Sequence, residues 1–242
     1  DLWSDKTIVD GLASIAPSEG VLSEEGGKSI PNITLRLIIN RGGEQGAQHS
    51  QALHSVLSHF PRLKIVMPYS AKDAGELLLS AINYNGPSIY IDDRWLYEEK
   101  STKIFNPKIS PALKNIRPKI TKKGSDLTIV SFGYGSKLAK DISIELMQHD
   151  KKSELIDLRI INPLKIENII KSINKTKKIV FIDIGYKNSS IGSTLISDLN
   201  EKINFKFKSK IFGIYDSPAP TSSYLEKFFY HNTNLISKMI IK

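Results

Sequence analysis

The stretch Gly43-Glu44-Gln45-Gly46-Ala47-Gln48-His49-Ser50-Gln51 joins two segments of different pattern. Before it, residues 33–39 form an apolar run interrupted only by Arg36, which predicts a strand. After it, residues 51–59 predict a short helix. His49 therefore lies where a strand run ends and a helix begins, which is where α/β sheets place their functional groups.

The alternation of strands and helices continues beyond this loop. Residues 64–67 and 88–91 predict buried strands, and residues 71–83 predict a helix between them, because apolar side chains recur there at helical spacing. The recurring positions are Ala74, Leu77, Leu78, Ala81 and Ile82. Alternating units of this kind imply a parallel sheet covered by helices.

A change of composition divides the chain into two domains. Residues 97–123 contain Pro107, Pro111 and Pro118 and show little periodicity, so they predict a linker. We expect a partial first domain at residues 1–96 and a second domain at residues 124–242. The second domain repeats the alternation, which predicts a doubly wound α/β unit. Its strands are expected at residues 127–132, 154–158, 178–184 and 210–214, and its helices at 137–149, 166–173, 190–203, 224–229 and 234–240.

Composition excludes several classes of function. The net charge is +9, but the lysines are scattered and no arginine-rich patch with interleaved aromatic residues appears, so we expect no nucleic-acid partner. There is no cysteine, which excludes disulfides, thiolate metal ligands and a thiol nucleophile. No signal peptide opens the chain and no apolar run approaches a membrane span. We therefore expect no membrane contact and a cytoplasmic location.

Three motifs in order identify a family resemblance. They are Gly46-Ala47-Gln48-His49-Ser50-Gln51, then Pro61-x-Leu63-Lys64-Ile65-Val66-Met67-Pro68, then Asp73-Ala74. Together they resemble the β subunit of the thiamine-diphosphate-dependent 2-oxoacid dehydrogenases, in the transketolase-like superfamily. The resemblance begins near Ile30. It implies a partial pyrimidine-binding α/β domain followed by a transketolase C-terminal-type, doubly wound α/β domain.

The resemblance identifies His49 as the candidate catalytic residue, beside thiamine diphosphate, where it assists acyl transfer to a lipoyl group. The other histidines are expected to be structural: His54, His59, His149 and His231. The family often also holds a structural potassium ion on backbone carbonyls. Those positions fall on Ile33, Ala81, Tyr84 and Gly86, which are equally compatible with ordinary core and turn positions.

Several other motifs are interpreted as structural. Gly133-Tyr134-Gly135 follows a strand and precedes a helix, but it lacks the third glycine of a dinucleotide motif and predicts a turn. Asp92 and Asp93 are adjacent at a strand end, so they point to opposite faces and do not share a metal. Asp183 lies at another strand exit.

The cofactor implied by the resemblance is thiamine diphosphate with Mg²⁺. In the superfamily its diphosphate is held by a Gly-Asp-Gly motif followed by Asn-Asn, and neither is present. An α-like subunit would have to supply that half. The glutamate that activates the cofactor's ring also has no clear counterpart, although Pro17-Ser18-Glu19-Gly20 faintly resembles its context. Further expected partners are a second β copy, in an α₂β₂ heterotetramer, and a lipoyl-bearing acyltransferase.

Two functions from different classes follow. The first is a β-like enzyme subunit that decarboxylates a 2-oxoacid and transfers its acyl group to a lipoyl or other acceptor, which the loop around His49 favours. The second is a non-catalytic docking paralogue or fragment, which the missing glutamate favours. A nucleic-acid binder rests on charge alone and would require salt-sensitive DNA binding.

Overall fold

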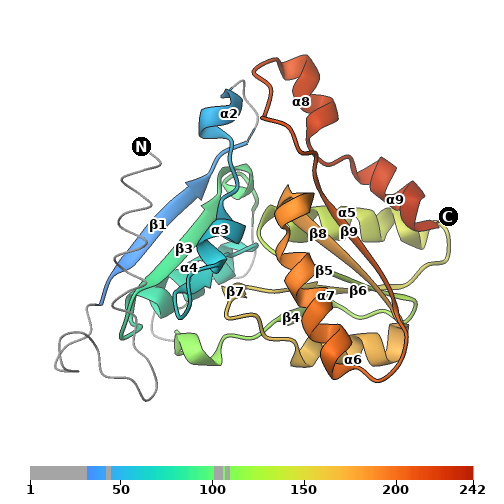
Figure 1. The fold of residues 1–242 in the computed structure, drawn as a ribbon, viewed down its shortest axis with the longest axis horizontal. Coiled ribbons are helices and arrows are strands. Elements are labelled where there is room, and N and C mark those ends of the chain that lie inside the picture. The colour runs from blue at the N-terminus through green and yellow to red at the C-terminus, as the bar shows by residue number, and fades with distance from the viewer. Residues whose placement is uncertain (1–31, 42–44, 101–105, 107–109, 242) are drawn as a thin grey trace.

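The computed structural model describes residues 32–41, 45–100, 106 and 110–241. Two β-sheets lie side by side with helices packed around them, as the ribbon shows (Figure 1). Part of the opening stretch, residues 42–44, and the motif at residues 17–20 lie outside the described residues.

The first sheet is four-stranded, in the order β1-β3-β2-β7. Strands β1 (Thr34–Ile39), β3 (Ser88–Asp93) and β2 (Lys64–Val66) run parallel, as the alternation predicts. The fourth strand, β7 (Ile160–Asn162), comes from the second half of the chain and pairs with β2 in the antiparallel sense. The two halves of the chain therefore share one sheet.

One helix covers the outer face of the first sheet. Helix α4 (Ala71–Ile82) begins at Ser70, whose side chain accepts a hydrogen bond from the amide of Asp73, as a helix N-cap does. Its Leu77 and Ala81 are fully buried against this face. Burial of the stripe at helical spacing explains why the sequence predicts this helix correctly.

The second sheet is five-stranded, in the order β4-β6-β5-β8-β9. Strands β6 (Ser153–Asp157), β5 (Leu127–Ser131), β8 (Lys178–Tyr186) and β9 (Lys208–Ile214) are parallel, and β4 (Lys119–Lys122) is antiparallel to β6. The chain order reverses between β5 and β8. The carboxyl ends of these two strands therefore form the switch point of a doubly wound sheet.

Helices cover both faces of the second sheet. Along β5 the side chains alternate: Leu127 and Ile129 pack with helices α5 (Tyr134–Met147) and α9 (Thr233–Ile241). On the opposite face, Val130 packs in a cluster with residues of helices α6 (Glu167–Thr176) and α7 (Ile191–Lys202). Because successive side chains of a strand point to opposite faces, both faces are apolar and both are covered.

The remaining elements are short and partly unexpected. Helix α3 (His54–Ser58) is shorter than predicted, and helix α5 begins at Tyr134 rather than at residue 137. A one-turn helix, α2 (Gly46–His49), replaces the predicted loop around His49, and α8 (Ser223–Phe229) follows β9. Three 3₁₀ turns complete the described elements: η1 (Arg94–Leu96), η2 (Leu113–Asn115) and η3 (Lys187–Ser189). Strand β4 lies inside the expected linker, and the domain limits stay a prediction.

A single apolar cluster joins the two sheets. It includes Ile65 and Met67 from the end of β2 and Phe132 and Phe181 from the second sheet, all fully buried. A Cβ atom on Gly133, directly after β5, would lie 2.7 Å from Cε of Met67. Met67, which directly follows β2, therefore packs against Gly133 near the switch point of the second sheet, and Gly133 serves as a turn.

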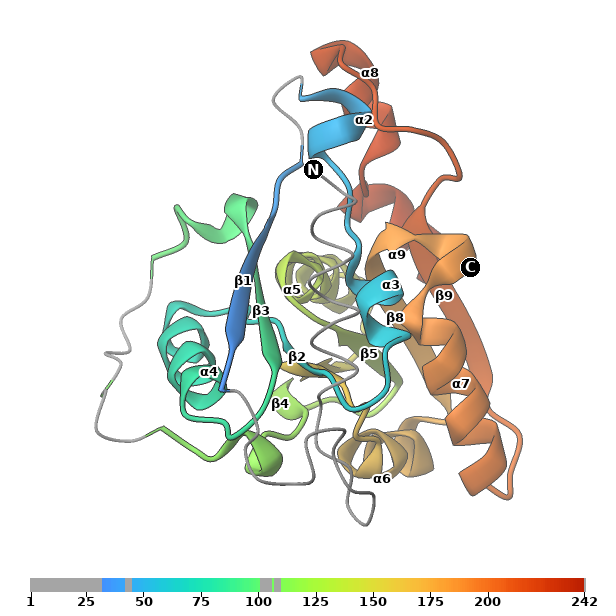
Figure 2. The ribbon, with the colours of Figure 1, turned by 60° about the vertical axis from the view of Figure 1, so that its left-hand side comes forward.

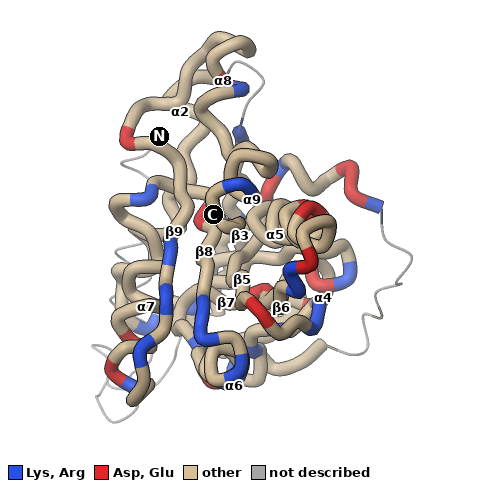
Figure 3. Tube along the Cα trace, turned by 90° about the vertical axis from the view of Figure 1, so that its right-hand side faces the viewer, with Lys and Arg blue, Asp and Glu red and all other residues tan. Residues whose placement is uncertain are grey.

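Lysines mark the exposed edge of the second sheet. Figure 3 shows them along β9, which carries Lys208 and Lys210 and follows Lys206. Charged side chains on an edge strand oppose pairing with another strand, so this row has a structural explanation that needs no nucleic acid. Among the residues described, no helix is long and apolar enough to cross a membrane. The cytoplasmic location stays a prediction.

Candidate active site

His49 lies at the end of helix α2, with an exposed side chain. Helix α2 lies beside the segment that leads into α8, as two views of the ribbon agree (Figures 1 and 2). The contact is close at Gly46, which has a φ of +68° and where a Cβ atom would lie 2.7 Å from Cγ2 of Thr221. Only glycine satisfies both conditions, so its place in the motif before His49 has a physical reason.

Arg41 fixes the chain before α2. Its guanidinium is buried and forms an ion pair with Asp93, and its carbonyl accepts a hydrogen bond from the indole of Trp95. The guanidinium carbon lies 4.8 Å from the ring centre of Trp95 and 4.7 Å from that of Tyr134, which belongs to α5. Burial lowers the pKa of Arg41 and the charge of Asp93 opposes that effect. The guanidinium thus joins the two domains.

His54 fixes the chain after α2. Its Nε2 lies 2.9 Å from Oδ1 of Asp183, at the carboxyl end of β8, and both side chains are completely buried. Its ring packs edge-on against Phe132, with 4.9 Å between ring centres. Burial alone would raise the pKa of Asp183, but the charge and hydrogen bond of His54, with further hydrogen bonds, hold that pKa below its ordinary value.

Three buried polar atoms on this same segment have no hydrogen-bond partner. They are Nε of Arg41, Oγ of Ser50 and Nδ1 of His54. Four further atoms of this kind belong to Asp73, Ser153, Asp157 and Arg159, so such atoms do not single out the segment that carries His49.

Two of the carbonyls named for potassium, those of Ile33 and Ala81, accept hydrogen bonds from Ser88. The amide of Ser88 donates to the carbonyl of Ile33 at 2.9 Å, and its hydroxyl donates to the carbonyl of Ala81 at 3.2 Å. The amide of Gly86 donates to the carbonyl of Tyr84 at 3.0 Å. The carbonyl of Ala81 also accepts a hydrogen bond from the amide of Tyr84 at 3.1 Å, so both of its lone pairs are already used. A potassium site here stays a prediction.

Asp92 and Asp93 point to different partners, as their position at a strand end predicts. Asp92 pairs with Arg36, at 2.6 Å, whereas Asp93 pairs with Arg41. Among the residues described, no group of three histidine, aspartate or glutamate side chains could hold a metal ion. The interpretation of this acidic pair as structural agrees with these contacts.

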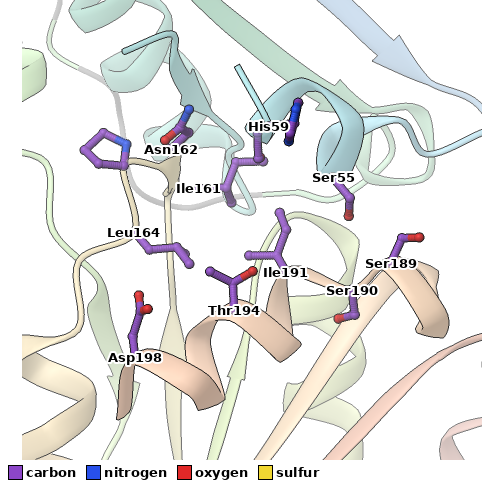
Figure 4. Close-up of a pocket in the computed structure, with 12 residues that line it drawn as sticks. Ser55, His59, Ile161, Asn162, Leu164, Ser189, Ser190, Ile191, Thr194 and Asp198 are labelled. Atoms are coloured by element: carbon purple, nitrogen blue, oxygen red, sulfur yellow. The ribbon is translucent and has the colours of Figure 1, made fainter. Parts of the chain in front are cut away.

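A pocket of about 470 Å³ lies between α3, the turn after β7 and the start of α7 (Figure 4). Its lining includes Ser55 and His59 from α3, Asn162, and Thr194 and Asp198 from α7. His49 is not part of this lining. His59 therefore faces this pocket, separate from the exposed histidine on α2.

Sequence reasoning missed the residues that hold His49 in place. Arg41 and Asp93 are 52 positions apart, and His54 and Asp183 are 129 apart, so neither pair has a local pattern. His54 was expected to be structural, and its buried ion pair agrees with that expectation. His231 also has a structural contact, since its Nε2 lies within hydrogen-bonding distance of the backbone carbonyl of Asp183.

Two family models match this chain. Residues 20–100 match "Transketolase, pyrimidine binding domain" and residues 117–236 match "Transketolase, C-terminal domain". The chain therefore belongs to the transketolase-like family, as a pyrimidine-binding domain followed by a C-terminal domain. These matches confirm the resemblance and the fold class inferred from the sequence.

Curated proteins similar to this chain include β subunits of pyruvate dehydrogenase and of an acetoin oxidoreductase. The chain is 35% identical, over 77% of its length and 40% of the relative, to pyruvate dehydrogenase E1 component subunit beta of Rhizobium meliloti. It is 37% identical to the protein of that name from Rickettsia conorii, over 62% of this chain and 45% of the relative. It is 27% identical to the acetoin:2,6-dichlorophenolindophenol oxidoreductase subunit beta of Cupriavidus necator, over 84% of this chain and 60% of the relative. The chain thus spans about half the length of the curated relatives it matches.

A solved structure confirms the fold independently. A chain described as "Split gene transketolase, inactive beta4 tetramer" superposes with a TM-score of 0.69 at 18% identity. The match covers 86% of this chain and 65% of the other. At that identity the likeness concerns the fold alone.

Proposed function

We propose that this chain is a β-like subunit of a thiamine-diphosphate-dependent 2-oxoacid dehydrogenase or decarboxylase. Together with an α-like subunit, it would decarboxylate a 2-oxoacid and pass the acyl group to a lipoyl or other acceptor. The observation that carries the proposal is the exposed His49 on a helix fixed between a pyrimidine-binding and a C-terminal domain. The relatives named pyruvate dehydrogenase E1 component subunit beta support the reaction class.

In this proposal the described residues supply one half of a thiamine diphosphate site. When bound, this cofactor supplies an electron sink for the carbanion left after a 2-oxoacid loses carbon dioxide. The described residues offer an exposed imidazole at His49, but no acidic cluster that could hold Mg²⁺. In this proposal the α-like subunit holds the diphosphate, so the cofactor site would lie between the two subunits.

His49 would act as the proton donor and acceptor of this half-site. An imidazole titrates near neutral pH, so it can give a proton to an acceptor and take one back within a single cycle. Its exposure allows another molecule to reach it. Arg41 and His54 do not take part in the chemistry in this proposal, because they are buried and paired with Asp93 and Asp183.

The assembly is proposed by analogy with the relatives, whose names describe them as subunits. We propose an α₂β₂ heterotetramer with a second copy of this chain, and contact with a lipoyl-bearing acyltransferase. A structural potassium ion on the carbonyls of Ile33, Ala81, Tyr84 and Gly86 is part of the same proposal. Its support is the family resemblance, together with the hydrogen bonds that bring the carbonyls of Ile33 and Ala81 to Ser88.

The competing proposal is a non-catalytic docking subunit or a fragment. Its support is that the ring-activating glutamate has no clear counterpart in the sequence. This competing proposal predicts a partner but no decarboxylation.

The test is recovery of the tagged chain from its native cell, followed by thiamine-diphosphate-dependent decarboxylation of 2-oxoacids by the recovered complex. We expect His49→Ala to lower kcat by roughly 10²-fold or more, as loss of a general acid–base does. His149→Ala is the matched control, because His149 is equally exposed but lies at the end of α5. Equal activity of the two variants would contradict the role of His49. A partner without any activity would favour the docking subunit.

A further inference from the structure

The segment from Arg41 to His54 is held from the second half of the chain at both of its ends and near His49. Arg41 lies against the ring of Tyr134, Gly46 lies against Thr221, and His54 pairs with Asp183. From the first half of the chain, Asp93 and Trp95 also contact Arg41 through the ion pair and the hydrogen bond described above. The C-terminal domain therefore contacts this segment in three places, although it offers no reacting group to it.

Asp183 is the most completely satisfied of these contacts. Its Oδ1 accepts hydrogen bonds from Nε2 of His54, at 2.9 Å, and from the amide of Gly185, at 2.8 Å. Its Oδ2 accepts from the hydroxyl of Ser190, at 2.6 Å, and from the amide of Ile191, at 3.2 Å. Every donor except His54 belongs to residues 185–191, the turn that runs from the end of β8 into the start of α7. That turn would keep Asp183 in place even without His54.

The pairing with His54 therefore acts on the first domain rather than on the turn. His54 is the first residue of α3, and His49 is the last residue of α2, so a short connection joins them. The ring of His54 is further confined by Phe132 and by Gly185, where a Cβ atom would lie 2.8 Å from Cε1 of the imidazole. Because His54 is the first residue of α3 and its ring is closely packed, these contacts fix the start of α3 relative to the second sheet.

We propose that Asp183 is a positioning residue that holds the His49 segment in place through His54. The C-terminal domain would thus set the place of the catalytic imidazole without touching it. This inference rests on the proposed function for its catalytic consequence, but its structural part can be tested on the chain alone. A general loss of stability is the alternative explanation for any effect of these residues, so the test must separate the two.

The first experiment compares amide hydrogen exchange in three variants of the whole chain. His54→Phe keeps a planar ring but removes the donor to Asp183, and His54→Gln restores a donor. Thr128→Val is the matched control, because Thr128 forms equally buried hydrogen bonds of 2.7 Å to Ser172 and Thr176, near the start of β5. We expect exchange at residues 45–53 to rise about tenfold in His54→Phe, as loss of a charge-assisted hydrogen bond predicts. His54→Gln should reverse most of this rise, and Thr128→Val should show no rise at 45–53.

Unchanged exchange at residues 45–53 in His54→Phe would overturn the proposal. An equal rise in Thr128→Val would also overturn it, because it would show a general loss of stability. If His54→Phe does not fold, Asp183→Ala removes the acceptor and tests the same contact from the other side, with the same expected rise. These outcomes do not depend on catalysis, so they stand even if the proposed function fails.

The second experiment uses the recovered complex and asks whether His54 acts through His49. In the native background we expect His54→Phe to lower kcat roughly tenfold with little change of KM, because a misplaced catalytic group loses rate more than binding. In a His49→Ala background the same change should lower kcat less than about twofold, because the group it positions is gone. An equal loss of kcat in both backgrounds would overturn the positioning role. If His49→Ala alone leaves kcat unchanged, the proposed function fails, and the exchange data still decide whether Asp183 holds the segment.

Discussion

Asp157 should make the stability of this protein fall as the pH rises from about 4 to about 7. The side chain lies at the end of β6 and is almost fully buried. The pKa of its carboxyl group is raised from 3.8 to about 7. Burial is the largest cause of this rise; the hydrogen bond from Ser136 opposes it, and the charge of Asp73 adds to it. Its Oδ2 has no hydrogen-bond partner, as suits a neutral carboxyl group in this place.

The sign and the size of this change in stability follow from the pKa values of Asp157 in the unfolded and the folded chain. In the unfolded chain the carboxyl group loses its proton near pH 4, whereas in the folded chain it keeps the proton up to about pH 7. Between these values the folded state binds more protons, so the free energy of unfolding falls as the pH rises. At about 1.4 kcal/mol for each pH unit, the loss amounts to about 4 kcal/mol across this window.

The assay is urea unfolding of the native chain and of Asp157→Asn at a series of pH values between 4 and 8. Asparagine keeps an oxygen for the hydroxyl of Ser136, which donates to Oδ1 of Asp157 at 2.9 Å, and it cannot ionise. The stability of the variant relative to the native chain should rise by about 4 kcal/mol between pH 4 and pH 7, then level off. Asp126→Asn is the control. Asp126 lies at the surface and its pKa is lowered, so the difference in stability between this variant and the native chain should not change with pH above pH 5. A pH-independent difference for Asp157→Asn would refute the reasoning.

Three further predictions concern stability and solubility. Phe181→Ala should lower the free energy of unfolding by about 3–5 kcal/mol, because Phe181 is fully buried. Val56→Ala, at an exposed position, should change it by less than about 0.5 kcal/mol. Urea unfolding measures both variants, and equal losses would contradict the assigned core. Gly46→Ala should loosen the contact with Thr221, because it adds a Cβ at a positive φ, and hydrogen exchange around residue 46 should rise while the rest of the chain stays unchanged. Lys208→Val, on the edge strand, should increase aggregation measured by light scattering, and a soluble variant would mean that other features protect this edge.

The sequence predicts the regular elements of this fold well because burial enforces their patterns. Helix α4 places Leu77 and Ala81 at helical spacing on one covered face, and β5 sends alternate side chains to two covered faces. Strand β7 was missed because it is three residues long and pairs with a strand far away in the sequence. Helix α2 was missed because its glycine-rich turn has no apolar period, and its place depends on Thr221.

The choice of His49 as the candidate catalytic residue stays a prediction, made from a motif and from its place between a strand and a helix. The residues that hold its segment could not be predicted. Its supports, Arg41 and His54, follow from tertiary contacts that no local pattern records, because each pairs with a carboxylate on a different element. Ion pairs of this kind depend on which strand ends meet at the domain boundary, and that information lies in the topology.

Strand β7 has a consequence for how this protein is made. The first sheet takes its last strand from residues 160–162, which a ribosome synthesises only after β5 and β6 of the second sheet. Until then β2 would present an unpaired edge, and unpaired edges attract other chains. Any cut between residues 93 and 160 separates β7 from the other strands of its sheet. The two halves of this chain must therefore be produced together, in one polypeptide or in one cell, for the first sheet to gain its fourth strand.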